Sequence, residues 1–166
     1  MNSYMNRKQT ILALAAVMVL SLLVGCGVKK SQANYDFKSK VLSTNYDGTY
    51  VIRTQVRARN AAIAFTDAQR KAVQEVIFDG VDAASNGVEA LKPILFDMNA
   101  RHKYEDYFAA FFRDGGEWTK YASLADKRTG TTTYKRNGVQ SIETVTVTVD
   151  RKALRERLIA DGILEK

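Results

Sequence analysis

The most chemically versatile group of neighbouring residues in this sequence is His102 with the acidic residues around it. Asp97, Glu105 and Asp106 lie within five residues of His102. A spacing of four residues puts His102 and Asp106 on one face of a helix, where they could hold a metal ion or exchange a proton. However, His102 is the sole histidine, and no second cluster exists to complete a ligand set. We therefore expect no metal, no cofactor and no catalytic residue, and we interpret His102 as a surface residue.

The common catalytic motifs are absent from the sequence. It contains no glycine-rich phosphate loop, no G-x-S-x-G elbow, no HExxH and no cysteine pair. A serine or threonine nucleophile needs a base, and a triad assembled from distant residues would depend on the one histidine. We expect a protein that is not an enzyme.

The only cysteine, Cys26, lies where an apolar N-terminal segment ends. Residues 1–10 are polar with two positive charges, and residues 11–25 are fifteen apolar or small residues without a charge. This is the layout of a secretory signal peptide, whereas a membrane-spanning helix needs about 20 apolar residues. The sequence predicts a signal peptide over 1–25. The alternative is an uncleaved anchor in which Cys26 is an incidental thiol.

Leu23-Val24-Gly25-Cys26 resembles a bacterial lipobox. The resemblance implies that the signal peptidase recognises Leu23, Val24 and Gly25 and that Cys26 carries the lipid. Several acyl chains would give the stable membrane anchoring that one chain cannot. Residues 27–30 contain no aspartate, which is similar to lipoproteins sorted to the outer membrane. We expect a lipid-anchored protein of the outer membrane that faces the periplasm.

The net charge of +7 restricts the partners of the chain only weakly. Arg7 and Lys8 lie in the predicted signal peptide, which has no acidic residue, so +5 remains after its removal. This charge is compatible with contact to anionic lipid or phosphate, or with a solvated basic surface. We expect no nucleic-acid partner because an exported, lipidated protein would rarely meet nucleic acid.

The chain after Cys26 divides into a polar tether over 26–48 and a domain over 49–166. The domain begins with an alternating sequence, "TYVIRTQVRARN", which predicts a half-buried strand. Arg53, Arg57 and Arg59 fall on its polar face. Three arginines in line could bind phosphates or carboxylates, or could form a solvated face that discourages edge aggregation.

Helical periodicity follows in two segments. Residues 66–81 combine Thr66 and Gln69 at capping-box spacing with a stripe of alanines, which predicts a helix that begins at Thr66 and packs closely on a sheet. Residues 101–116 carry a stripe of tyrosines and phenylalanines before Gly115-Gly116, which predicts an aromatic helix packed in the core.

The C-terminal part predicts strands and a final helix. Asn137-Gly138 has the type I′ hairpin signal, and the run after it alternates valine with threonine. Asp150 can cap a helix whose Leu154 and Leu158 face inward. The order of elements predicts an α+β fold with helices packed on one face of a mainly antiparallel sheet.

The segments "RARNAAIAFTDAQRKAVQEVIFDGV", "KYEDYFAAFFRDGGEW" and "VTVTVDRKALRERL" resemble small envelope lipoproteins. These are of the lipoprotein-20 type and of the type of the N-terminal domain of flagellar assembly protein T, and the likeness is greatest to uncharacterised Bacteroides-type lipoproteins. The resemblance implies a domain that serves envelope assembly or secretion through a protein partner. The alternative is a periplasmic module that binds a small ligand or glycan through Trp118, Tyr121 or the arginine face.

Overall fold

A computed structural model describes residues 38–84, 87–125 and 141–165 of the chain. The described residues all belong to one compact unit, Asp36–Lys166. The predicted signal peptide, Cys26 and the Asn137-Gly138 turn lie outside the described residues. What the structure tests is therefore the domain.

The domain is built on a five-stranded sheet with the strand order β3-β1-β2-β5-β4. Four of its strands pair antiparallel, and β3 joins the edge parallel to β1. The bounds of the strands are β1 (Lys40–Thr44), β2 (Thr49–Ala58), β3 (Asp82–Ala83), β4 (Ala122–Leu124) and β5 (Ser141–Asp150). Because β1 is part of the sheet, the domain begins before residue 49, and the tether predicted for 26–48 is too long.

The two long strands, β2 and β5, form the centre of the sheet. They pair over their whole length, from Thr49 opposite Asp150 to Ala58 opposite Ser141. On one face, Ile52 is fully buried opposite the fully buried Val147. The period-two alternation in both sequences buries every second side chain on this face, which confirms the predicted half-buried strands.

Helix α2 (Ala61–Gln74) packs on that buried face. Its N-cap is Asn60, whose side chain accepts a hydrogen bond from the backbone N–H of Ile63 at 2.9 Å. The prediction that the helix begins at Thr66 is therefore wrong. An earlier residue already satisfies the first N–H groups, and Thr66 instead donates its hydroxyl to the carbonyl of Ala62 inside the helix. The helix starts almost directly after β2 ends at Ala58.

Alanines allow α2 to lie close to the sheet. Ala64, Ala68 and Ala72 are buried along one side of the helix. The helix continues as a π-helical turn, η1 (Glu75–Asp79), and stops at Gly80 with φ of 76°. A Cβ at Gly80 would lie 2.6 Å from the carbonyl oxygen of Leu91, so glycine is required there by both its φ angle and its neighbour.

The remaining helical elements carry the aromatic part of the core. The predicted aromatic helix is two short helices, α3 (Ala100–Lys103) and α4 (Glu105–Phe111), because the backbone leaves the helical conformation at Tyr104. A 3-10 turn, η2 (Glu117–Lys120), follows. Phe108, Phe111 and Trp118 are buried, which confirms that the aromatic stripe belongs to the core.

The last helix, α5 (Arg151–Ala160), follows β5 directly. Asp150 is its N-cap and accepts a hydrogen bond from the backbone N–H of Ala153 at 2.8 Å, as predicted. Leu154 and Leu158 are fully buried.

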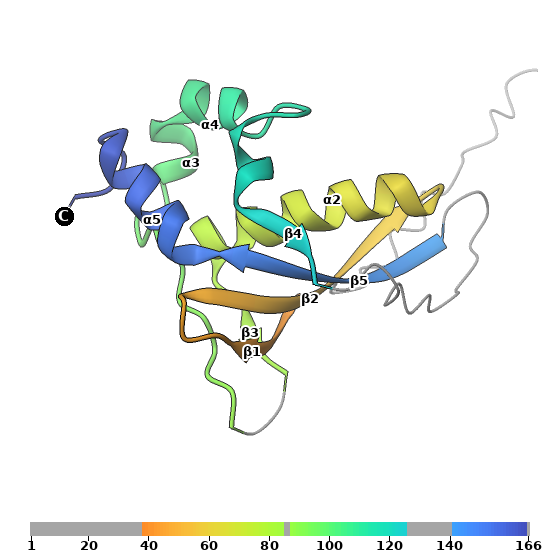
Figure 1. Ribbon diagram of the computed structural model, residues 1–166. Coiled ribbons are helices and arrows are strands. Elements are labelled where there is room, and N and C mark those ends of the chain that lie inside the picture. Colours follow the sequence, from red (N-terminus) through yellow and green to blue (C-terminus); the bar gives the residue numbers. More distant parts are fainter. Residues whose placement is uncertain (1–37, 85–86, 126–140, 166) are drawn as a thin grey trace, which may run out of the picture. The chain divides into compact units, whose positions relative to one another are not determined.

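The helices gather on one side of the sheet. Figure 1 shows α2, α3 and α4 on that side, with α5 leading toward them from the end of β5. The predicted fold class is confirmed, because helices pack on one face of a mainly antiparallel sheet. We call the helices and turns of this side the helical layer.

Candidate functional site

The opposite side of the sheet carries no helix among the described residues (Figure 1). Because side chains alternate along a strand, the residues between the buried positions of β1, β2 and β5 point to this side. We call it the open sheet face and define it by Lys40, Ser43, Val51, Arg53, Gln55, Arg57, Ile142, Thr144, Thr146 and Thr148.

A row of charged and polar residues crosses the open sheet face over four strands. Asp82, Lys40, Arg53 and Thr146 are successive cross-strand partners. The ammonium of Lys40 lies 3.3 Å from a carboxylate oxygen of Asp82. On its other side, Lys40 is directly opposite Arg53. Like charges in directly opposite positions destabilise a strand pair, so the sheet maintains this cationic pair at a cost.

Arg53 has an exposed side chain, and within the described segments no ion pair involves it. Its nearest strand neighbours on the other side are threonines rather than acids, since Thr146 is its partner in β5. A guanidinium has five N–H donors and no acceptor, and it suits carboxylate and phosphate groups. Arg53 is thus available to an anionic group from outside the domain.

Threonines supply the rest of the polar chemistry of this face. Thr144, Thr146 and Thr148 stand opposite Gln55, Arg53 and Val51. The amide of Gln55 lies 3.4 Å from the hydroxyl of Thr144, at the long end of the hydrogen-bond range. Thr144 is buried, whereas Thr146 and Thr148 are half-buried. Hydroxyls both donate and accept, so Thr146 and Thr148 beside the cations favour oxygen-rich anionic groups.

The residues predicted as a binding face are divided by the structure. Arg53 and Arg57 lie together on the open sheet face, both exposed. Arg59 is exposed but lies beyond the end of β2, between Ala58 and the cap Asn60, so the predicted line of three arginines is a line of two.

Trp118 is not a surface residue, so its prediction as a ligand contact is wrong. Its side chain is 1% exposed. Its indole N–H donates to the carbonyl of Arg113 at 2.9 Å, and the guanidinium carbon of Arg70 lies 5.3 Å from the ring centroid. The largest apolar side chain fills the space between η2 and α2, where it excludes the most water from the core.

Tyr121 also belongs to the helical layer and not to the open sheet face. Its half-buried ring stacks on Phe111 with the centroids 6.1 Å apart. Burial raises the pKa of the Tyr121 hydroxyl. The sequence placed Trp118 and Tyr121 as alternatives to the arginine face, and the structure separates both of them from Arg53 and Arg57.

A network of polar and charged side chains links α4 to the end of α5. Asp161 accepts hydrogen bonds from the hydroxyl of Tyr107 at 2.6 Å and from Nε of Arg157 at 2.7 Å. Burial opposes ionisation of Asp161, but these two bonds outweigh it and lower the pKa of Asp161. Burial and the same carboxylate raise the pKa of Tyr107. The groups satisfy one another, so the network ties the end of α5 to α4.

Glu75, the first residue of η1, has a pKa that is shifted upward, opposite to the shift of Asp161. Burial raises its pKa, against hydrogen bonding from Ser39 and attraction to Lys71. Its Oε1 lies 3.5 Å from the ammonium of Lys71, while its Oε2 is buried with no hydrogen-bond partner in the described part of the chain. Folding therefore shifts the ionisation equilibrium of the Glu75 carboxyl toward its protonated form, relative to an exposed glutamate.

His102 lies on α3 with a side chain that is 92% exposed and an Nδ1 atom 3.7 Å from a carboxylate oxygen of Glu105. Across residues 38–84, 87–125 and 141–165, no three histidine, cysteine or acidic side chains are grouped as metal ligands. The arrangement around His102 thus offers a single exposed pair.

A second surface feature is a hollow beside the hairpin of β1 and β2. Its volume is about 590 Å³. One wall comes from β1 and β2 with Ser43, Thr44 and Tyr50, and the other from residues 87–91. Local sequence patterns did not predict this hollow, because Ser43 and Thr44 fall within the predicted tether. The signal that could have found it is the turn-forming run Asn45–Gly48 between two short apolar stretches.

Comparison with protein-family models, with curated proteins and with solved structures finds no match to this chain. In the part of the chain that the structure describes, none of the helices has the length and apolar character needed to cross a membrane.

Proposed function

We propose that this chain is a non-enzymatic lipoprotein of the outer membrane, facing the periplasm, that binds another envelope protein in secretion or surface-structure assembly. Acyl chains on Cys26 anchor it, and the open sheet face binds an acidic surface of the partner.

The observation that carries the proposal is the cationic pair on the open sheet face. Lys40 and Arg53 stand directly opposite each other, and only Lys40 has an acidic neighbour within the sheet, Asp82. A carboxylate from a partner beside Arg53 would relieve the repulsion and form a charge-assisted hydrogen bond. The hydroxyl-lined sheet surface around the pair suits another protein surface better than it suits a buried small ligand.

The chain between Cys26 and the domain is short enough to keep the domain near the membrane. Lys38, the first described residue, is twelve residues after Cys26. A fully extended chain spans at most about 3.5 Å per residue, so the domain would stay within about 40 Å of the lipid surface. An envelope protein beside the membrane lies within that distance.

The anchor is tested by metabolic labelling with a fatty acid. The wild-type chain should take up the label, and Cys26→Ser should not, because a hydroxyl cannot form the thioether. Label that persists in Cys26→Ser would contradict the lipoprotein assignment.

The face is tested by crosslinking in intact membranes, with a photoreactive residue introduced at Thr146. We expect a discrete adduct with a second protein that disappears in Arg53→Glu and weakens with added salt. Arg155→Glu, which makes the same charge change at an exposed position of α5, is the matched control and should retain the adduct. An adduct that survives Arg53→Glu, or that both variants abolish equally, would contradict binding through the open sheet face.

A further inference from the structure

The hollow beside the β1–β2 hairpin differs in chemistry from the open sheet face. Its side chains are the hydroxyl-bearing Ser43, Thr44 and Tyr50, the carboxylate of Glu89 and the apolar Val88 and Leu91. None of the described residues that line it is a lysine or an arginine. Hydroxyls donate and accept, while a carboxylate only accepts. The hollow therefore suits a neutral ligand rich in hydrogen-bond donors and disfavours an anion.

The size of the hollow also fits a small polar ligand. At about 590 Å³ it falls within the range of about 300–1,000 Å³ that small-molecule sites occupy. Apolar side chains, Val88 and Leu91, lie among the polar ones, as in sites where a few polar groups orient a ligand.

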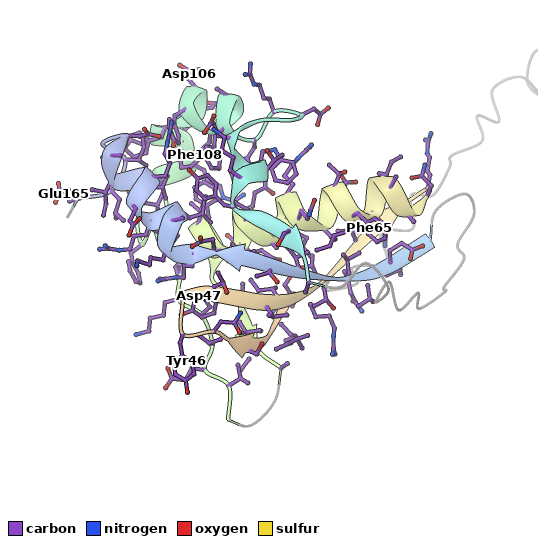
Figure 2. All side chains as sticks on the ribbon, in the orientation of Figure 1. Tyr46, Asp47, Phe65, Asp106, Phe108 and Glu165 are labelled. Carbon is purple, nitrogen blue, oxygen red and sulfur yellow. The ribbon has the colours of Figure 1, made fainter. Side chains whose placement is uncertain are left out.

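Tyr46 lies in the turn of the β1–β2 hairpin, close in sequence to two residues that line the hollow, Ser43 and Thr44. It follows Thr44 by two residues, and its side chain is fully exposed. Figure 2 shows it pointing away from the sheet into solvent. An aromatic ring that neither the core nor a neighbouring chain segment covers is free to stack on a ligand.

The turn that carries Tyr46 is braced by its own polar side chains. Thr49 donates its backbone N–H and its hydroxyl to the carboxylate of Asp47, at 2.8 and 2.7 Å. The side-chain amide of Asn45 donates to the hydroxyl of Thr49 at 2.8 Å. Hydrogen bonding from Thr49 lowers the pKa of Asp47. The turn thus presents Tyr46 on a preorganised support, which reduces the entropy lost when a ligand binds.

We propose that Tyr46 and the hollow form a binding site for a neutral saccharide. The apolar face of a sugar ring stacks on Tyr46. The sugar hydroxyls donate to Glu89 and exchange hydrogen bonds with Ser43 and Thr44. The site is separate from Arg53 and Arg57, so it depends neither on the lipid anchor nor on the protein contact proposed above.

The test is calorimetric titration of the full chain, held in a detergent without a sugar headgroup. The probes are a tetramer of N-acetylglucosamine, which is neutral, and a tetramer of galacturonic acid, which is acidic. We expect the neutral probe to bind and the acidic probe to bind more weakly, because Glu89 repels its carboxylates.

Three variants locate the site. Tyr46→Ala removes the stacking ring and should weaken binding of the neutral probe by about tenfold, a loss of the size expected when an exposed aromatic contact is removed. Glu89→Gln should weaken it by a similar factor of about ten through loss of a charged acceptor. Phe96→Ala removes an aromatic side chain that is 73% exposed outside the hollow, and it should leave binding unchanged.

Failure would be evident from the same titrations. Absence of binding at millimolar probe, tighter binding of the acidic probe, or binding unaffected by both Tyr46→Ala and Glu89→Gln would each overturn the proposal. Circular dichroism shows whether each variant keeps the fold, and Tyr46 is exposed enough that its removal costs no core contact.

Discussion

The two faces of the central sheet share the strands β2 and β5 but differ in the side chains that they carry. On the helical layer side, Ile52 and Val147 are partners and both are fully buried. At the next position of this antiparallel pair, Arg53 and Thr146 are partners on the open sheet face, where Arg53 is exposed. Burial of apolar area stabilises the fold, while exposed cations and hydroxyls add little to stability. The comparison indicates that the helical layer holds the domain together, while the other face, as far as the described residues show it, carries charged and hydroxyl-bearing side chains.

The largest effect on this comparison should come from Trp118→Ala. The side chain is 1% exposed and packs between η2 and α2. Its removal leaves a cavity and takes away one of the two hydrogen bonds that the carbonyl of Arg113 accepts, the other coming from the backbone N–H of Gly116. We expect a loss of about 3–5 kcal/mol in the free energy of unfolding. Urea denaturation followed by circular dichroism measures it. The matched change on the open sheet face, Thr146→Ala, should cost much less. Equal losses would contradict the division of roles.

Asp150→Ala tests the cap that joins the sheet to the helical layer. The carboxylate accepts the backbone N–H of Ala153 at 2.8 Å, and alanine cannot. We expect a loss of about 1 kcal/mol, the usual cost of an N-cap. Asp150→Asn keeps an acceptor and should recover most of it. If Asn and Ala are equally destabilising in urea denaturation, the hydrogen bond is not the source of the stability.

Glu75→Gln tests how a buried acidic side chain on the helical layer side makes the stability of the domain depend on pH. The pKa of Glu75 is raised in the folded chain above its ordinary value of 4.5, chiefly by burial. The stability linked to its protonated form is therefore present below about pH 4.5 and is lost as the pH rises through the folded pKa. Glutamine stays neutral, so the variant should lose less stability than the wild type as the pH rises from about 4.5 through the folded pKa of Glu75.

Urea denaturation across that pH range measures the difference, and Glu156→Gln on the exposed side of α5 is the control. A pH dependence that is the same in Glu75→Gln as in the wild type would show that Glu75 is not a source of it.

The smallest effect should come from Arg53→Thr. Removing one of two opposed cations relieves the repulsion with Lys40, so we expect a gain of about 0.2–1 kcal/mol in the free energy of unfolding. The same variant should lose the crosslinked partner. A variant that is less stable than the wild type would show that Arg53 supports the fold, and the face would then not be free for recognition.

Much of the domain followed from local pattern. The alternation in β2 and β5, the alanine stripe of α2 and the cap at Asp150 are each properties of a few neighbouring residues, and each was confirmed. The start of α2 was misplaced because two polar residues, Asn60 and Thr66, both have capping character. Only the position at which β2 ends decided between them.

The candidate sites were less predictable because they depend on pairing between distant segments of the chain. The alternation put Arg53 and Arg57 on a polar face, but nothing local revealed that Lys40 would be the strand partner of Arg53. Trp118 was predicted as a possible ligand contact, but its burial depends on packing against α2, more than forty residues earlier in the chain.

The sequence by itself determined which residues alternate, where the helices carry their apolar stripes and where an N-terminal leader and a lone cysteine stand. These are local features, because propensity and periodicity act between residues a few positions apart. The tertiary structure alone decided three further features. The described helices all lie on one side of the sheet, Lys40 is the strand partner of Arg53, and a hollow forms between the β1–β2 hairpin and residues 87–91. Those facts depend on pairing between distant segments, and pairing is set by the burial of the whole core.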